Sequence, residues 1–303
     1  MLSVYRCLLE EMPPGNMVLD CDMGAHTSLK AGGKAALLIV PRSMDELRRT
    51  LAVLSRSGCG YTAIGSGTNI LVCDSGYLGA IVKIGEAFSQ IEVSGKALSA
   101  GAGAPVAAVA RAAMEAGLAG LEFASGIPGS IGGAVFMNAG AYGSEMKGVV
   151  RSVSLISKDG QREYALGAAD LGFSYRHSSM QDTGDIITGA ALELEYGDAE
   201  EIKGKMREFA ELRNAKQPVG MPSAGSFFKR PYGHFAGKLI EDCGLKGLTV
   251  GGAAVSPLHA GFIVNNGEAT ASDIIDLMHL VQHTVYDRFA VKLEPEVRII
   301  GDA

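Results

Sequence analysis

A glycine-rich run between Ser125 and Gly143, SGIPGSIGGAVFMNAGAYG, restricts the fold of this chain more than any other feature of its sequence. The run holds six glycines and follows the apolar stretch LAGLEF. Because glycine lacks a Cβ atom, its main chain can come close to a ligand, and neighbouring N–H groups can converge on an anion. The run therefore predicts a loop that lies against a diphosphate-bearing cofactor.

A second glycine-rich turn, GSGTNIL from Gly65 to Leu71, follows the strand-like run YTAI. Taken alone, this turn fits a structural role at least as well as a binding role. Both loops, however, carry small hydroxyl or amide side chains: Ser66, Thr68 and Asn69 in one, and Ser125, Ser130 and Asn138 in the other. Such groups suit a diphosphate and the ribityl or ribose oxygens attached to it, so the pair of loops favours a ligand.

Length, charge and cysteine usage limit the class of protein. The 303 residues leave room for roughly two or three domains. A net charge of −6 without a long basic block argues against binding to nucleic acid or anionic lipid. No apolar segment is close to the length of a membrane span, about 18 residues. The first residues, MLSVYRCLLEEMPPG, do not have the pattern of a secretion signal. The five cysteines lack metal-binding spacing. We expect a cytoplasmic protein with reduced thiols and no metal.

The first two-thirds of the chain combine helical and strand patterns. Ser43 and Glu46 fit a capping box for a helix that ends at Gly58, and AALLIV, YTAI and ILVC flank it as strands of a βαβ unit. Strands near Ile91 and Leu98 precede a helix with Pro105 at its first position and Gly117 as its stop. Alternating residues from Val149 to Leu155, the Asp159-Gly160 turn and a run ending at Tyr196 predict antiparallel strands.

The last third predicts a further α+β domain. Asp198 with Glu201 caps a helix that leads into it. The expected elements are a helix from Phe235 to Cys243, strands near Val250 and Phe262, a helix capped by Thr270, and a strand near Val297. The whole chain is thus an α+β protein.

Two motifs have better structural than functional interpretations. GAGAPV at Gly101 lacks the third glycine of a dinucleotide-binding fingerprint, which would fall at Val106, so a tight strand-to-helix turn is preferred. His279 and His283 lie four residues apart on one helix, but no glutamate between them and no third ligand completes a metal site. A solvated helix face explains this pair.

Three polar residues stand in segments where function is an open alternative to a surface ion pair or a capped turn. Arg176 lies in FSYRHS, Ser226 in the glycine-serine turn of PSAGSFFKRP, and Glu296 in the otherwise apolar strand LEPEVRII.

Together these segments resemble the UDP-N-acetylenolpyruvoylglucosamine reductase (UDP-N-acetylmuramate dehydrogenase) family, the flavoenzymes of peptidoglycan precursor synthesis. The resemblance runs almost end to end through HTSLKAGG, IGSGTNILV, SGIPGSIGGAVFMNAGAYG, LGFSYRHS, RNAKQPVGMPSAGSFFKRP, AGKLIEDCGLKG and LEPEVRIIG. It implies an FAD-binding region of the vanillyl-alcohol-oxidase type in two subdomains, 1–86 and 87–212, and a smaller substrate-binding domain, 213–303. It also implies a monomer that binds a UDP-sugar.

The resemblance assigns roles residue by residue. Arg176 and Glu296 would stabilise the intermediate, Ser226 would protonate the substrate, and Lys216 and Arg230 would bind its diphosphate or sugar. The residues expected to hold FAD are Gly65, Ser66, Gly67, Thr68, Asn69, Ile70, Ser125, Gly126, Pro128, Gly129, Ser130, Gly132, Gly133, Asn138 and Gly140.

The implied reaction uses NADPH to reduce FAD, which passes hydride to the terminal carbon of an enolpyruvyl group. A cation beside the carboxylate lowers the barrier as negative charge develops there, a role that suits Arg176. A proton from Ser226 to the adjacent carbon then gives a D-lactyl group. Two other functions stay open: an FAD-dependent oxidase of the same fold, disfavoured because neither cofactor loop has a histidine or cysteine to tether flavin, and a non-catalytic UDP-sugar- or flavin-binding module.

The chain departs from the common family pattern at Ala31, Lys34 and Ser66, which bears on local loop geometry. Only a short stretch separates Arg176 from the strand at Ile186. That spacing implies the subgroup with the shorter loop, called type II.

Overall fold

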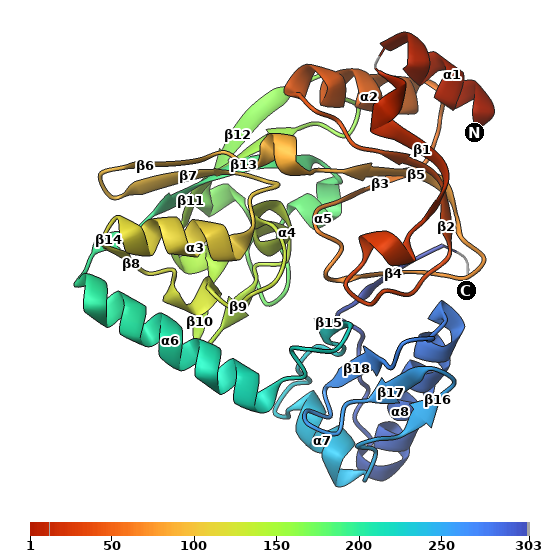
Figure 1. The fold of residues 1–303 in the computed structure, drawn as a ribbon, viewed down its shortest axis with the longest axis vertical. Coiled ribbons are helices and arrows are strands. Elements are labelled where there is room, and N and C mark those ends of the chain that lie inside the picture. Colours follow the sequence, from red (N-terminus) through yellow and green to blue (C-terminus); the bar gives the residue numbers. More distant parts are fainter. Residues whose placement is uncertain (12, 302–303) are drawn as a thin grey trace. The chain divides into compact units, whose positions relative to one another are not determined.

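The computed structural model describes residues 1–11 and 13–301, which form two compact units (Figure 1). Unit 1 comprises Met1–Leu19, Leu37–Ser66 and Gly79–Leu212. Unit 2 comprises Asp20–Ala36, Gly67–Leu78 and the residues from Arg213 onward. Each unit has its own cluster of buried apolar side chains. None of the described helices is both long and apolar enough to cross a membrane.

The core of unit 1 is built on a five-stranded antiparallel sheet of order β12-β11-β13-β7-β6. The expected Asp159-Gly160 turn joins β11 to β12, and the φ of Gly160 is +74°, a conformation that glycine adopts without strain. The antiparallel prediction for this region is therefore confirmed. The strands are β6 (Ile91–Ser94), β7 (Ala97–Gly101), β11 (Val150–Ile156), β12 (Glu163–Gly167) and β13 (Ile186–Glu193).

Helices α3 (Val106–Glu115) and α4 (Ile131–Phe136) pack against this sheet, α3 on β6 and α4 on β7 and β13 (Figure 1). Pro105 is the residue before α3 and not its first helical residue, so that boundary differs by one position from the prediction. Further elements of unit 1 are α1 (Leu2–Glu11), β3 (Tyr61–Ile64), β8 (Leu118–Ala119), β9 (Gly140–Ala141), β10 (Ser144–Glu145), α5 (Met180–Thr183) and β14 (Glu195–Tyr196).

Helix α2 (Met44–Arg56) begins where the sequence predicts, but its capping box is only half formed. The Ser43 hydroxyl accepts the N–H of Glu46 at 3.1 Å, as expected. The Glu46 carboxylate does not return to Ser43; it accepts bonds from the Arg42 N–H and the Asn16 amide, each at 2.8 Å. The buried amide of Asn16 therefore takes the place of the second half of the box.

The predicted βαβ unit around α2 is wrong in its pairing. A sheet of order β1-β2-β5-β3 places β5 (Tyr77–Lys83) between β2 (Lys34–Ile39) and β3, and β5 runs parallel to β3. The third expected strand, ILVC, forms β4 (Ile70–Val72) and belongs to unit 2. Strands β1 (Met17–Asp22), β2 and β5 each contain a point where the chain passes between the units.

The last helix of unit 1 is α6 (Ala199–Lys216), whose final residues belong to unit 2. The Asp198 carboxylate accepts the N–H groups of Glu200 and Glu201 at 3.0 Å each, which confirms the predicted cap. Ile202 is the one residue of α6 that is buried, so this helix is mostly solvated.

Unit 2 contains a four-stranded antiparallel sheet of order β15-β18-β17-β16, covered by α8. Thr270 and Asp273 form the complete capping box at the start of α8, as predicted. The elements are β15 (Ser223–Ser226), α7 (Ala236–Asp242), β16 (Thr249–Val250), β17 (Ala253–Val255), β18 (Phe262–Asn265), α8 (Ala271–Phe289) and β19 (Arg298–Ile300).

Two early segments of the chain complete unit 2. Strand β4 pairs in parallel with β19, and the buried Asn265 amide donates to the carbonyls of Leu29 and Lys30 at 2.9 and 3.2 Å. The Asp74 carboxylate accepts the N–H of Ala271 at the first turn of α8. Parts of the predicted 1–86 subdomain thus pack with the C-terminal part of the chain. The division into 1–86, 87–212 and 213–303 stays a prediction.

Candidate functional site

The two glycine-rich loops meet inside unit 1 at Gly65 and Ser130. A Cβ atom on Gly65 would lie 2.2 Å from the Ser130 Oγ, far inside van der Waals contact, so the close approach requires glycine. Ser130 is 2 % exposed, and its Oγ has no hydrogen-bond partner. A buried hydroxyl without a partner costs about 1–3 kcal/mol and calls for an explanation, such as a missing ligand.

The rest of the Ser125–Gly133 loop lies against the turn between β7 and α3. The N–H groups of Ile131 and Gly132 donate to the carbonyls of Ala104 and Ala102 at 2.9 and 2.8 Å. A Cβ on Gly132 would lie 2.9 Å from the Ala102 Cβ, which gives that glycine a packing reason. Gly133 is exposed, so a ligand can reach the main chain there. Within this loop Pro128 and Gly133 are the exposed residues.

The GAGAPV turn has the structural role that its sequence predicts. A Cβ on Gly101 would lie 2.2 Å from the Phe88 carbonyl oxygen, and one on Gly103 would lie 2.0 Å from that of Gly85. These glycines admit a neighbouring main-chain segment and no cofactor is needed to explain them.

Asn138 and Gly140 close the glycine-rich run. Asn138 is fully buried with a φ of 42°, and both ends of its side-chain amide are occupied: Nδ2 donates to the Ser174 carbonyl at 3.0 Å, and Oδ1 accepts the Lys147 N–H at 2.9 Å. A Cβ on Gly140 would lie 2.5 Å from the Ser144 carbonyl oxygen, so β9 and β10 require glycine there. Both residues have structural roles, and their contact with a cofactor stays a prediction.

Arg176 lies in unit 1 at the tip of a tight turn. Ser174 and His177 exchange backbone bonds of 3.1 and 3.2 Å, which leaves Tyr175 and Arg176 at the two central positions. The φ of Arg176 is 56°, in the left-handed region that residues with a Cβ seldom occupy. Its guanidinium lies 5.1 Å from the centre of the Tyr175 ring. Left-handed backbone at a polar, half-buried residue marks a candidate functional position.

Unit 2 brings Ser226, Glu296 and part of the Gly65–Ile70 loop into one region. Glu296 donates its N–H to the Phe227 carbonyl at 2.8 Å, next to Ser226 on β15. Its own carbonyl accepts the Asn69 amide at 3.0 Å. Glu296 precedes β19, so its predicted place inside the C-terminal strand is wrong.

The Gly65–Ile70 loop also contacts the segment around His26. A Cβ on Gly67, whose φ is +69°, would lie 2.1 Å from the His26 carbonyl oxygen. Ser28 in turn donates its N–H to the Gly67 carbonyl at 3.1 Å. Gly67 through Ile70 therefore lie in unit 2, whereas Gly65 and Ser66 lie in unit 1.

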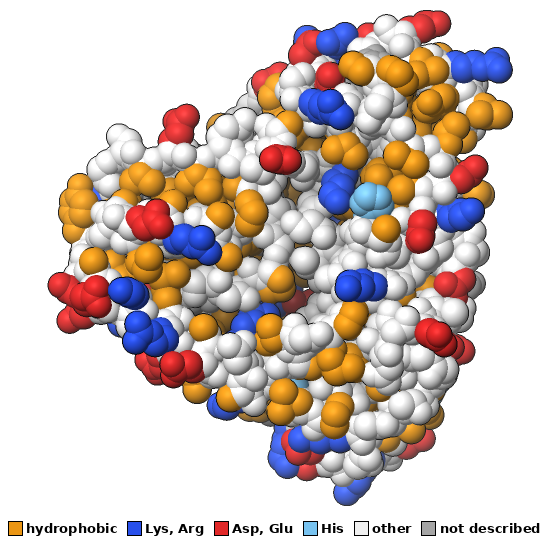
Figure 2. Space-filling view, in the orientation of Figure 1, with side chains coloured by type: hydrophobic (Ala, Val, Ile, Leu, Met, Phe, Trp, Pro, Cys, Tyr) orange, Lys and Arg blue, Asp and Glu red, His pale blue; other side chains and the backbone are white. Residues whose placement is uncertain are grey.

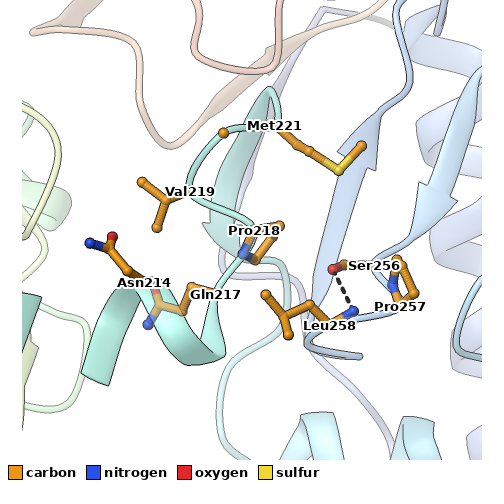
Figure 3. A pocket seen from close by; sticks show the side chains of 9 residues that line it. Asn214, Gln217, Pro218, Val219, Met221, Ser256, Pro257 and Leu258 are labelled. Carbon is orange, nitrogen blue, oxygen red and sulfur yellow. Dashed lines mark hydrogen bonds between the residues drawn. The ribbon is translucent and has the colours of Figure 1, made fainter. Parts of the chain in front are cut away.

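Lys216 and Arg230 are both exposed residues of unit 2. Lys216 ends α6, and the Arg230 guanidinium lies 4.5 Å from the centre of the Phe235 ring. The chain on either side of Lys216 lines a cavity of about 440 Å³, a size suited to a small ligand (Figure 3). Its lining residues are Asn214, Gln217, Pro218, Val219, Gly220 and Met221, faced by Ser256, Pro257 and Leu258.

Other histidines, cysteines and cavities provide little evidence of a further functional site. His279 and His283 are both exposed on α8, and the described residues contain no group of three or more metal-binding side chains. None of the five cysteines, all within the described residues, forms a disulfide bond. A second cavity of about 580 Å³, lined in part by Asp22, Lys30 and Asp74, includes none of the predicted site residues. On the face shown in Figure 2, basic and acidic side chains are interspersed.

Sequence reasoning missed two side chains beside Arg176. The Ser178 hydroxyl donates to the Phe136 carbonyl at 2.7 Å, and the Gln181 amide donates to the carbonyls of Phe136 and Arg176 at 2.8 and 3.1 Å. A hydroxyl and an amide that follow an arginine give no signal in a single sequence, because their partners are main-chain atoms brought close by the fold.

Comparison with known proteins identifies the cofactor domain. Residues 35–163 match the FAD binding domain family, and residues 217–300 match the C-terminal domain of UDP-N-acetylenolpyruvoylglucosamine reductase. The buried Ser130 hydroxyl and the glycine loops agree with FAD as the bound group.

Relatives and solved structures extend the match to the whole chain. UDP-N-acetylenolpyruvoylglucosamine reductase of Alkaliphilus oremlandii is 46 % identical over 99 % of both chains, and that of Clostridioides difficile is 43 % identical over 99 % of this chain and 98 % of its own length. The crystal structure of the reductase from Thermus caldophilus superposes with a TM-score of 0.81 at 34 % identity, covering 94 % of this chain and 98 % of that one.

A glucose dehydrogenase, wild-type Phl p 4.0202, shares the fold alone, with a TM-score of 0.52 at 13 % identity over 95 % of this chain and 63 % of its own. The matches confirm the expected α+β architecture, an FAD-binding region of the vanillyl-alcohol-oxidase type followed by a smaller C-terminal domain. The chain belongs to the UDP-N-acetylenolpyruvoylglucosamine reductase family.

Proposed function

We propose that this protein reduces the enolpyruvyl group of UDP-N-acetylglucosamine enolpyruvate to a D-lactyl group, with FAD as cofactor and NADPH as the hydride donor. The product is UDP-N-acetylmuramate, a precursor of peptidoglycan. The observation that carries the proposal is the unpartnered Ser130 hydroxyl enclosed where the two glycine loops meet, in a chain of this family. We further propose a cytoplasmic monomer of the short-loop subgroup, with domains 1–86, 87–212 and 213–303.

When bound, FAD would supply the hydride transfer from NADPH to the terminal carbon of the enolpyruvyl double bond. Within unit 1, the chain would hold it through the Ser130 hydroxyl and the exposed main chain at Gly133. Glycine at positions 65 and 67 is needed because neighbouring protein atoms leave no room for a Cβ.

Arg176 would stabilise the negative charge that develops on the substrate carboxylate as hydride arrives. Guanidinium suits this task because it stays protonated and can bind a carboxylate through two parallel N–H groups. Gln181 donates to the carbonyls of both Arg176 and Phe136, the last residue of α4, so the charge would be positioned before the substrate reacts.

Ser226 would donate a proton to the carbon next to the carboxylate. A serine hydroxyl is a weak acid, so it can act only when it is held close to a strongly basic, carbanion-like centre. Glu296 lies beside the Ser226 segment through the bond between its N–H and the Phe227 carbonyl. Its carboxylate would orient the hydroxyl or help to replace the proton. Lys216 and Arg230 would bind the diphosphate and sugar.

The test is substrate-dependent oxidation of NADPH by the purified protein. The proposal requires that the protein be yellow, release FAD on denaturation, and consume NADPH in proportion to D-lactyl product under anaerobic conditions. An FAD-dependent oxidase would instead turn over with oxygen in the absence of the sugar nucleotide. A binding module would bind the UDP-sugar without oxidising NADPH, and either outcome would refute the proposed reaction.

A further inference from the structure

The turn that carries Arg176 is held by a partly buried network of side-chain amides and a hydroxyl, which includes Asn138 from the end of the glycine-rich run. Asn138 donates to the Ser174 carbonyl at the first corner of the turn. Gln181 donates to the carbonyl of Arg176 itself and to that of Phe136. We call this set, Asn138, Ser178 and Gln181, the amide clamp.

The amide clamp fixes a conformation that would otherwise be unfavourable. Left-handed φ angles at non-glycine residues cost of the order of 1–3 kcal/mol and persist only where the surroundings enforce them. Both Asn138 and Arg176 have such angles, 42° and 56°. Asn138 and Ser178 are fully buried, so water cannot replace their bonds.

The clamp also connects Arg176 to the cofactor loop. Helix α4 begins directly after Ser130 and ends at Phe136, whose carbonyl accepts bonds from both Ser178 and Gln181. Six helical residues span only about 9 Å. The Arg176 turn is therefore bonded to the far end of the short helix whose first end forms the cofactor loop.

We propose that Asn138 and Gln181 are positioning residues of the reaction: they set the Arg176 guanidinium relative to the cofactor loop through the main chain of the turn. This inference rests on the proposed function, in particular on Arg176 as the group that binds the substrate carboxylate. It assigns to Asn138 a role in holding Arg176 in place of a side-chain contact with FAD, since both ends of its amide are already bonded.

The test replaces Gln181 with methionine, which has nearly the same length and no N–H donor. The matched control is Gln90→Met, because the exposed Gln90 also donates to a main-chain carbonyl, that of Ala87 at 2.8 Å, elsewhere in unit 1. Both variants should contain FAD and be reduced by NADPH at the wild-type rate. Reoxidation by the enolpyruvyl substrate should slow by about ten- to hundredfold in Gln181→Met alone, as expected for a displaced charge.

Two readouts separate positioning from general destabilisation. In an Arg176→Ala background, Gln181→Met should have no further effect on reoxidation, because the group it positions is absent. In the protein without substrate, hydrogen exchange at the His177 N–H should accelerate by about tenfold or more in Gln181→Met and not in Gln90→Met. Asn138→Asp, which replaces the donor to Ser174 with an oxygen, should behave like Gln181→Met.

The outcomes distinguish failure of this inference from failure of the proposed function. If wild type is not reoxidised by the substrate, the proposed function is wrong. If wild type and Arg176→Ala behave as expected but Gln181→Met matches wild type, the positioning role is overturned. It is equally overturned if Gln181→Met slows reoxidation by the same factor with and without Arg176.

Discussion

The contact between Gly65 and Ser130 allows a quantitative prediction of how two substitutions affect the free energy of unfolding. In Gly65→Ala the new Cβ would lie 2.2 Å from the Ser130 Oγ, about 1.2 Å inside ordinary contact. Overpacking of this kind typically costs about 1–3 kcal/mol. The Ser130 Cβ lies 3.4 Å from the same point, so Ser130→Ala removes the overlap completely. The double variant should therefore regain most of the free energy of unfolding that Gly65→Ala loses.

Ser130→Ala alone should affect the apoprotein and the holoprotein in opposite directions. Without FAD, the variant loses a buried hydroxyl that has no partner, so the free energy of unfolding should stay equal or rise by up to about 1–3 kcal/mol. With FAD, it loses a bond to a charged group worth about 1.5–3 kcal/mol, which corresponds to about 10- to 150-fold weaker binding.

The assay is a double-mutant cycle on flavin-free protein, measured by urea unfolding, together with FAD titration followed by flavin fluorescence. Gly148→Ala is the matched control, because a Cβ at Gly148 would meet no atom within 4 Å. The predicted coupling between the two substitutions is about 1–3 kcal/mol. Coupling near zero would refute the steric argument, and unchanged FAD affinity in Ser130→Ala would refute the role of this hydroxyl.

Three further predictions concern other parts of the chain. Ser226→Ala should retain FAD and its reduction by NADPH while reoxidation by the enolpyruvyl substrate slows by about 10²-fold or more in stopped-flow measurements; an unchanged rate would exclude the proton donor. Gly103→Ala places a Cβ 2.0 Å from the Gly85 carbonyl oxygen and should lower the urea midpoint of unfolding. The folded variant should bind FAD as tightly as wild type. Weaker FAD binding by the folded variant would make this turn part of the cofactor site. Burial lowers the pKa of His259, so below about pH 6.5 the unfolded chain binds more protons than the folded one and the free energy of unfolding should fall. His259→Gln should flatten this dependence of the free energy of unfolding on pH. An equal dependence in both proteins would show that His259 is not its source.

Two carboxylates with lowered pKa values, Asp273 and Asp74, titrate outside the pH range of the histidine test. The N–H groups of Thr270 and Gly252 hold the pKa of Asp273 below its ordinary value, so its stabilising contribution is complete above about pH 4 and is lost only as pH falls through the lowered pKa. Bonds from Ser272 and Ala271 outweigh the effect of burial and likewise lower the pKa of Asp74. Both groups therefore titrate well below the range in which His259 acts.

Local signals in the sequence predicted much of the fold. The cap at Asp198, the capping box of Thr270 and the Asp159-Gly160 turn each depend on residues within a few positions of one another, and the structure confirms them. Pairing over long distances could not be predicted in this way. The run ILVC looks like the next strand after YTAI, yet β4 pairs with β19 more than two hundred residues later.

In the candidate site, too, local signals could be predicted from the sequence and long-range contacts could not. The glycine loops predicted close main-chain approach, and the contact of Gly65 with Ser130 explains the first of them. At Gly132, glycine is needed because the Ala102 side chain leaves no room for a Cβ. The sequence does not distinguish this packing requirement from a requirement for cofactor binding. The left-handed backbone of Arg176 could not be predicted either, because the bonds that hold its turn include one from Asn138, which is distant in the sequence.

A single-turnover experiment shows whether the reduced flavin of this protein transfers hydride to the enolpyruvyl group. The protein is reduced with NADPH under anaerobic conditions and mixed with UDP-N-acetylglucosamine enolpyruvate, and the flavin absorbance is followed in time. We expect the flavin to be reoxidised without oxygen and one D-lactyl product to form per flavin. Flavin that stays reduced until oxygen is admitted would contradict the proposed reaction.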